Sequence, residues 1–275
     1  MKLLILGGNG MAGHVLVDYF KRQGKHKVWY TTRDLHDRDS LFVDVAQYGT
    51  VEKLIEIVRP DIIINAIGVL NQFANEDKIN AYAVNSFLPH RLRRLAEQHE
   101  ARLIHISTDC VFEGTKGSYT EEDEPDGTST YALTKMMGEV NAPGHLTIRT
   151  SIIGPEIRNR AIGLLHWFLS QKGTVSGYQK VIWNGVTTLE LAKAVDSLLD
   201  RDLSGLIHLT GQEPISKYDL LKLIQQVWAK HDVTIVPQDT PVCDKTLICT
   251  RKDFAYQVPS YKEMLEELKE WNRTI

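Results

Sequence analysis

Tyr131 and Lys135 stand four residues apart and are the side chains of this sequence best suited to move a proton. Residues i and i+4 share one face of a helix, so both side chains would point the same way. An unperturbed tyrosine hydroxyl titrates at about pH 10, and a nearby cation stabilises its anion. The pair therefore predicts a proton donor or acceptor, although an ordinary exposed helix face can show the same spacing.

A glycine-rich turn follows the first apolar run of the chain. Lys2–Leu6 is short and continuously apolar, which is typical of a strand buried on both faces of a parallel sheet. It leads into the stretch Gly7–Gly13, which matches the pattern G-x-G-x-x-G, and then into helical spacing from Val15 to Phe20. In this order, glycines let the backbone approach a pyrophosphate at the start of a helix. The segment predicts a dinucleotide site.

The end of the second expected strand indicates which dinucleotide would bind. Lys27–Tyr30 runs into Thr31, Thr32 and Arg33. An NAD site usually places an acidic residue here for the ribose 2′-hydroxyl, whereas an NADP site supplies a cation for the 2′-phosphate. Arg33 therefore favours NADPH, and Asp34, one residue later, leaves NADH as the alternative.

Polar residues follow two further expected strands. Asp61–Ala66 and Arg102–Ile106 read as buried parallel strands, and the second leads into Ser107, Thr108 and Asp109. Ligands gather at the carboxyl ends of such strands, so we expect these hydroxyls to face the same crevice as the tyrosine and lysine. By the same rule, Asn65 falls on the cofactor side, and Asp44 in the expected strand Leu41–Val45 lies near the adenine.

The pattern predicts an α/β fold with a Rossmann-type, doubly wound parallel sheet. Strands and helices alternate through residues 1–150, which we expect to bind the cofactor and to be completed by an element from residues 181–209. Residues 151–275 lose that alternation and predict a smaller α/β lobe for substrate. Within the first part, Gly68–Lys78 has no clear period and predicts a loop, whereas Ala81–Asn85 opens a helix.

Composition excludes several classes of function. A formal net charge of −3 argues against a nucleic-acid binder, and no apolar run is long enough to span a bilayer. The three cysteines, Cys110, Cys243 and Cys249, fit neither a disulfide framework nor a metal knuckle, and the ten histidines show no metal-ligand spacing. We therefore expect a cytoplasmic protein with no metal, no nucleic acid and no membrane among its partners.

In their order, these motifs resemble those of the extended short-chain dehydrogenases/reductases. Within that superfamily, the run Ser107–Gly114 resembles the Ser-Thr-Asp-Tyr-Val-Phe-x-Gly run of dTDP-4-dehydrorhamnose reductases and related nucleotide-sugar 4-ketoreductases. The likeness extends to Asp244–Leu247, Pro259–Tyr261 and Leu265–Leu268. It implies NADPH-dependent reduction of the C4 keto group of a dTDP- or UDP-linked 4-keto-6-deoxyhexose by a cytoplasmic enzyme, working as a homodimer.

The resemblance also implies roles for individual residues. Tyr131 protonates the carbonyl oxygen, Thr108 hydrogen-bonds that oxygen, and Lys135 holds the nicotinamide ribose and lowers the pKa of the tyrosine. Trp183, in the segment Val181–Thr188 where the lobes meet, packs on the base or sugar. The expected cofactor-binding residues are Gly7, Asn9, Gly10, Met11, Gly13, Arg33, Asp44, Val45, Asn65, Ala66, Ile67, Asn85, Ser107, Tyr131 and Lys135, and the expected substrate-binding residues are Val69, Thr108, Asp109, Cys110 and Trp183.

Two departures and two rivals leave the assignment open. Cys110 stands where the reductases usually have tyrosine, and Gly68–Lys78 lacks the sequence that the family usually has in that loop. The resemblance therefore leaves the identity of the sugar open. A 4,6-dehydratase would need an Asp-Glu pair after Thr108, where this chain has Asp109 and Cys110, and an epimerase would need tightly held NAD. The other rival is a non-catalytic NADP-binding regulatory subunit, which need not keep the full Thr-Tyr-Lys set.

Overall fold

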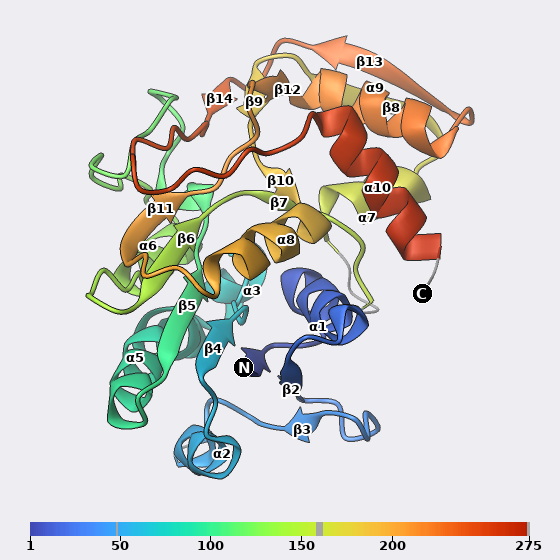
Figure 1. Ribbon diagram of the computed structural model, residues 1–275. Helices are drawn as coiled ribbons and strands as arrows, with labels where there is room; N and C mark the ends of the chain where they lie inside the picture. Colours follow the sequence, from blue (N-terminus) through green and yellow to red (C-terminus); the bar gives the residue numbers. More distant parts are fainter. Residues whose placement is uncertain (48, 158–161, 274–275) are drawn as a thin grey trace.

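A seven-stranded sheet forms the centre of the molecule (Figure 1). The structure is a computed structural model and describes residues 1–47, 49–157 and 162–273. The sheet has the order β11-β6-β5-β4-β1-β2-β3, and every neighbouring pair is parallel. Its strands are β1 (Lys2–Leu6), β2 (Lys27–Thr32), β3 (Leu41–Phe42), β4 (Ile62–Asn65), β5 (Arg102–Ile106), β6 (Leu146–Arg149) and β11 (Gly205–His208). The order of the first six strands confirms the predicted Rossmann-type fold.

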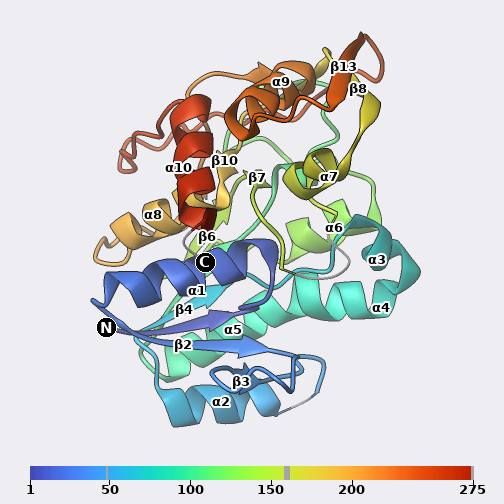
Figure 2. The same cartoon turned by 90° about the vertical axis from the view of Figure 1, so that its right-hand side faces the viewer.

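Alternating side chains of the strands build two cores, one on each face of the sheet. Leu3 and Ile5 of β1 pack in one cluster with helices α1 (Met11–Gln23) and α8 (Thr188–Leu198). The intervening residues Leu4 and Leu6 pack in another cluster with α2 (Thr50–Val58) and α5 (Leu88–Gln98). Figure 2 shows α1 and α5 on opposite sides of the sheet. Burial on both faces explains why these strands read as continuous apolar runs.

Between β4 and β5 the chain forms a series of short helical segments. These are α3 (Asn71–Glu76), α4 (Lys78–Ala81), a π-helix (Tyr82–Phe87) and α5. The prediction of a loop over Gly68–Lys78 is therefore wrong in its middle. Helix α3 buries only Ala74, so its sequence carries no apolar period.

The C-terminal half adds small sheets and three more helices above the main sheet (Figure 1). Strand β7 (Ile152–Ile153) pairs with β10 (Val186–Thr187), β8 (Gly173–Tyr178) pairs with β13 (Val233–Gln238), and β9 (Val181–Trp183) lies between β12 (Ile215–Ser216) and β14 (Cys243–Asp244). The helices are α7 (Leu164–Ser170), α9 (Lys217–Trp228) and α10 (Tyr261–Arg273). Because β11 comes from this half and pairs with β6, the domain boundary at residue 150 stays a prediction.

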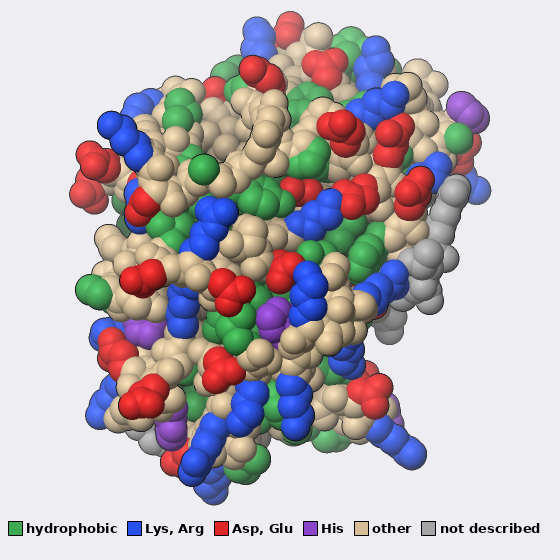
Figure 3. All heavy atoms as spheres, in the orientation of Figure 1, with side chains coloured by type: hydrophobic (Ala, Val, Ile, Leu, Met, Phe, Trp, Pro, Cys, Tyr) green, Lys and Arg blue, Asp and Glu red, His purple; other side chains and the backbone are tan. Residues whose placement is uncertain are grey.

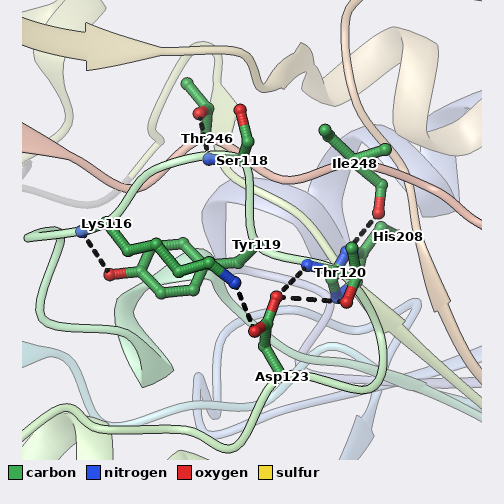
Figure 4. A network of polar contacts seen from close by, with 8 residues as sticks. All are labelled: Lys116, Ser118, Tyr119, Thr120, Asp123, His208, Thr246 and Ile248. Carbon is green, nitrogen blue, oxygen red and sulfur yellow. Dashed lines mark hydrogen bonds and ion pairs between the residues drawn. The ribbon is translucent and has the colours of Figure 1, made fainter.

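A polar network fastens the segment after β5 to the C-terminal half (Figure 4). The Ser118 backbone N–H donates to Thr246 Oγ1 at 2.8 Å, and the Tyr119 N–H donates to the Thr246 carbonyl at 2.8 Å. The Tyr119 carbonyl accepts from the Ile248 N–H at 2.7 Å, and Tyr119 stacks on Phe112 with centroids 4.0 Å apart. These contacts hold the segment after β5 against residues that lie more than a hundred positions later in the chain.

The distribution of charged side chains on the surface agrees with the modest net charge of the sequence. On the face drawn in Figure 3, acidic and basic side chains are intermixed. Among the helices of the described ranges, none has the length and apolar character needed to cross a membrane.

A substitution at Gly138 tests how closely the π-helix and α6 (Thr130–Met137) approach each other. A Cβ added at Gly138 would lie 1.8 Å from the backbone oxygen of Asn85, so Gly138→Ala forces the two helices apart. We expect the unfolding free energy to fall by about 1–3 kcal/mol, the usual range for overpacking. Urea denaturation followed by circular dichroism measures it. Gly68→Ala is the control, since its Cβ would meet only Asn85 Oδ1 at 3.8 Å, and an equal loss in both variants would contradict the explanation.

Candidate active site

A cavity of about 680 Å³ opens where the main sheet meets α6. A smaller pocket of about 100 Å³ adjoins it, and the two share residues of the glycine turn, Arg33 and the segment after β4. Sixteen of the predicted site residues line one or both: Gly7, Asn9, Gly10, Met11, Arg33, Asp44, Val45, Ala66, Ile67, Val69, Ser107, Thr108, Asp109, Cys110, Tyr131 and Lys135. Four do not, namely Gly13, Asn65, Asn85 and Trp183.

The glycine turn forms one end of the cavity. Gly7 adopts a φ of 88°, and the Gly10 N–H donates to the Gly7 carbonyl at 2.9 Å, so the chain turns sharply before α1 begins at Met11. Gly13 lines neither pocket, but its lack of a side chain allows a close backbone approach, because a Cβ there would lie 2.0 Å from the Gly7 carbonyl oxygen. The start of α1 can therefore approach the turn closely, as the pyrophosphate site of a dinucleotide requires.

Arg33 lies at the border of the two pockets. It follows β2, whose last residues Thr31 and Thr32 are buried, while the arginine itself is exposed. No ion pair joins its guanidinium to another residue of the described ranges. The position suits a cation for the 2′-phosphate of NADP, and the glycine cradle fits the same cofactor.

Helix α6 brings Tyr131 and Lys135 to the cavity wall. The Ser129 hydroxyl caps the helix by accepting from the Ala132 N–H at 3.1 Å. Lys135 is 3% exposed, and its ammonium donates to the Ile106 carbonyl oxygen at 2.8 Å. Burial lowers the pKa of Lys135 to about 8. Thr108 faces the same cavity, where its hydroxyl donates to Asp109 Oδ1 at 3.1 Å.

The phenol of Tyr131 is held in its protonated form. Burial raises the pKa of Tyr131, the neighbouring Cys110 and Asp109 add to the rise, and Thr108 opposes it. This is the opposite of the lowering by Lys135 that the resemblance implies. A protonated phenol at neutral pH is the form that a proton donor needs.

A buried histidine that the sequence analysis did not single out, His105, contacts Lys135. His105 is fully buried in β5, with its Nε2 3.4 Å from Lys135 Nζ and its Nδ1 3.1 Å from Asn65 Nδ2. Burial and the nearby lysine lower the pKa of His105 well below its usual value, so the ring is neutral. Asn65 Oδ1 also accepts from the Ile67 N–H at 3.2 Å. In the sequence, the signal that could have identified His105 was a histidine within an apolar strand, because a buried polar group needs hydrogen-bond partners.

Asn85 joins the segment after β4 to helix α6. Its side-chain oxygen accepts from the Val69 N–H at 2.8 Å, and its Nδ2 donates to the Val69 carbonyl at 2.9 Å and to Thr134 Oγ1 at 3.1 Å. Val69 lines both pockets, and Thr134 lies on α6 between the tyrosine and the lysine. We therefore expect Asn85, in the π-helix, to position Val69 relative to α6.

A buried ion pair fixes the strand end that carries Ser107. Arg149 at the end of β6 donates to Glu139 through two nitrogens at 2.7 Å each, and the Ser107 hydroxyl donates to the same carboxylate at 2.7 Å. The arginine and glutamate side chains are 4% and 10% exposed. A charged pair so deeply buried at a strand end was visible in the sequence only as isolated residues.

The structure does not bring Trp183 to the cavity. Its side chain is 5% exposed and packs in the core, with the ring centroid 5.6 Å from that of Tyr261. A Cβ at Gly185 would lie 2.5 Å from Trp183 and 2.0 Å from the carbonyl oxygen of Ser151, which lines the cavity. The indole thus lies behind the cavity wall, and its position does not support direct contact with a sugar.

Comparison with known proteins identifies the family. The family model described as RmlD substrate binding domain matches residues 1–246. The chain belongs to this family. It is 26% identical to a dTDP-4-dehydrorhamnose reductase of Sinorhizobium fredii over 98% of this chain and 96% of the relative. It is 25% identical to the methionine adenosyltransferase 2 subunit beta of Rattus norvegicus, over 80% of this chain and 70% of that protein.

A solved structure shares the whole fold. The crystal structure of dTDP-4-dehydrorhamnose reductase from Bacillus anthracis in complex with NADP superposes with a TM-score of 0.84, covering 98% of this chain and 99% of that chain at 20% identity. The described residues of the present chain contain no group of three or more His, Cys, Asp or Glu side chains placed to hold a metal ion.

Asn85→Asp tests the positioning role. The variant keeps the size of the side chain but removes both donated hydrogen bonds and sets a carboxylate against the Val69 carbonyl. A lost buried hydrogen bond costs about 1–3 kcal/mol, so we expect a lower melting temperature and NADPH affinity reduced about tenfold. Calorimetric unfolding and cofactor titration measure these. Exposed Asn75→Asp on α3 is the control, and full NADPH affinity in Asn85→Asp would refute the role.

Proposed function

We propose that this chain is an NADPH-dependent reductase of the C4 keto group of a nucleotide-linked 4-keto-6-deoxyhexose. The observation that carries the proposal is that Thr108, Tyr131 and Lys135 share one cavity with the glycine turn and Arg33. Family membership supports the reductase class, and the dTDP-4-dehydrorhamnose reductase relative spans almost the whole chain. The nucleotide, dTDP or UDP, is left open.

The residues of the cavity divide the work of carbonyl reduction. Bound NADPH supplies the hydride for C4. Tyr131 donates its phenolic proton to the carbonyl oxygen, and burial keeps that proton in place until the transfer. Lys135 holds the nicotinamide ribose with the ammonium protons not engaged by Ile106. Thr108 turns its hydroxyl from Asp109 toward the substrate oxygen.

Two features argue against the dehydratase and the regulatory subunit. Cys110 occupies the place where elimination would need a second carboxylate, and burial raises the pKa of its thiol to about 12, so the thiol stays protonated and cannot serve as a base. The chain shares 25% identity with a methionine adenosyltransferase 2 subunit beta, but it keeps threonine, tyrosine and lysine together at one cavity. That set supports catalysis.

Cellular location and assembly extend the proposal. We propose a cytoplasmic enzyme, since the three cysteines are free thiols. We also propose a homodimer, supported by apolar side chains near α6 that are open to solvent: Phe87 is 66% exposed and Met137 is 49% exposed. Size-exclusion chromatography with light scattering measures the assembly, and a monomer at micromolar concentration would contradict the homodimer.

A substrate panel tests the function directly. Purified protein is mixed with NADPH or NADH and with 4-keto sugars made in place by dTDP-glucose and UDP-GlcNAc dehydratases. Loss of nicotinamide absorbance with at least one keto sugar, and none without it, is the expected result. A protein that binds NADPH but reduces none of the sugars would favour the regulatory alternative.

Arg33→Ala tests the choice of cofactor. Losing one charge-assisted phosphate contact costs about 1.5–3 kcal/mol, so NADPH affinity should fall about tenfold or more while NADH affinity hardly changes. Fluorescence titration of each cofactor measures both affinities. Arg94→Ala, an exposed arginine on α5, is the control. Equal losses for NADPH and NADH would refute a 2′-phosphate contact.

Tyr131→Phe tests the proton donor. A positioned acid supplies at least about a hundredfold in rate, so kcat should fall by that factor while NADPH affinity and the circular dichroism spectrum stay unchanged. Stopped-flow and steady-state absorbance measure the turnover of the substrate found in the panel. The control is Tyr178→Phe, where the side chain is 38% exposed and lies far along the chain in β8. Near-normal turnover in Tyr131→Phe would assign the proton to another group.

A further inference from the structure

A chain of buried polar contacts leads from Lys135 to Asn65. Lys135 Nζ lies 3.4 Å from His105 Nε2, and His105 Nδ1 lies 3.1 Å from the amide nitrogen Nδ2 of Asn65. Asn65 and His105 are paired in register on β4 and β5, and both are fully buried. Because the bulk solvent does not reach these side chains, the protein itself sets the direction of each hydrogen bond.

The backbone determines which end of the Asn65 amide faces the histidine. The Ile67 N–H donates to Asn65 Oδ1 at 3.2 Å, so the oxygen is turned toward the backbone and the nitrogen toward His105. An amide nitrogen only donates, and it therefore needs an unprotonated ring nitrogen as its acceptor. Burial and the nearby lysine keep the ring neutral, with a single N–H, so we assign that hydrogen to Nε2.

An N–H at Nε2 disfavours the charged form of Lys135. An ammonium group has three hydrogens and no lone pair, so it can donate to the Ile106 carbonyl but cannot accept from His105. The uncharged amine has a lone pair that accepts from Nε2–H, while one of its own hydrogens keeps the bond to Ile106. Only the amine satisfies both neighbours, and a hydrogen bond to the neutral form of a group disfavours its charged form.

Two other titratable groups act on this pair of side chains. Glu139, which follows α6, raises the pKa of Lys135 by its negative charge, and His90 on α5 lowers the pKa of His105. Burial outweighs the effect of Glu139, and the pKa of Lys135 lies at about 8. Both forms of the lysine are therefore accessible near neutral pH, whereas Tyr131, one turn earlier on the helix, stays protonated.

We propose that Asn65 and His105 are positioning residues that make Lys135 a stronger acid by holding an N–H against its ammonium group. The use of this acid rests on the proposed function. Once Tyr131 has given its phenolic proton to the substrate oxygen, the Lys135 ammonium returns a proton to the phenolate, and the amine that remains accepts from His105 Nε2. Solvent restores the proton of the lysine after the product leaves. The pair thus helps to reprotonate the proton donor between turnovers.

The tautomer of His105 tests the inference without any substrate. Heteronuclear NMR of protein labelled at the histidine and lysine nitrogens shows which ring nitrogen carries the hydrogen, and it follows each lysine through a pH titration. His105→Phe and Lys135→Met identify the two signals by their loss. In the wild type we expect the hydrogen on Nε2 of His105 and a pKa of about 8 for Lys135. A hydrogen on Nδ1 would overturn the inference.

Asn65→Leu separates the effect of the tautomer from that of burial. Leucine has about the size of asparagine but cannot donate, and the backbone carbonyl of residue 65, which favours a proton on the ring, remains. The hydrogen should move to Nδ1, Nε2 should accept from the ammonium, and the pKa of Lys135 should rise by about one pH unit. More apolar surroundings alone would lower that pKa, so a lower or unchanged value would contradict the inference. If the variant does not fold, the tautomer of the wild type still decides.

Asn75→Leu is the matched control, because Asn75 is exposed on α3 and the exchange is the same. It should leave the tautomer of His105 and the pKa of Lys135 unchanged. With the substrate found in the panel, the pH at which kcat declines on the alkaline side should rise in Asn65→Leu together with the pKa of the lysine. A protein that gives the expected NMR results but reduces no 4-keto sugar would refute the reductase proposal alone.

Discussion

The buried ion pair of Arg149 and Glu139 is the contact on which the geometry of the site depends. It joins the end of β6 to the segment after α6, and the same carboxylate holds Ser107 at the end of β5. Three elements that come from separate parts of the chain are thereby fixed to one carboxylate. Removing one partner of such a pair costs about 3–5 kcal/mol, because a charge would be left buried and unpaired. The pair therefore favours one arrangement of helix and strands over looser ones.

The same need to satisfy buried polar groups determines the contacts of the residues that line or lie behind the cavity wall. Lys135 is almost fully buried and relies on the Ile106 carbonyl and on neutral His105. Asn85 satisfies the backbone of Val69 in the way that a neighbouring strand would, but it does so from a helix. The π-helical turn around Asn85 supplies one extra residue per turn, and such turns often occur at functional sites. Chemistry and structural stability therefore draw on the same contacts.

The sequence predicted the fold well where burial dictates residue type. β1, β4 and β5 are buried on both faces of the sheet, so their continuous apolar runs identified them as strands. The glycines of the turn were identifiable because the backbone approaches closely there. Trp183 was less predictable. Its type suits a sugar as well as a core, and only its tertiary contacts, such as that with the ring of Tyr261, decide between them. His105 shows the same limit, because its neighbours come from β4 and α6.

The charged side chains that line the cavity are of both signs, with Arg33 and Lys135 cationic and Asp109 and Glu156 anionic. Arg33 lies with the glycine turn at the border of the two pockets, so it can attract an anionic cofactor to that border. Tyr131 and Thr108 are neutral, and burial keeps the phenol of Tyr131 protonated by raising its pKa. In the proposed reaction, Arg33 would orient the cofactor through its phosphate, and the phenol on the buried face of α6 would meet the carbonyl with its proton in place.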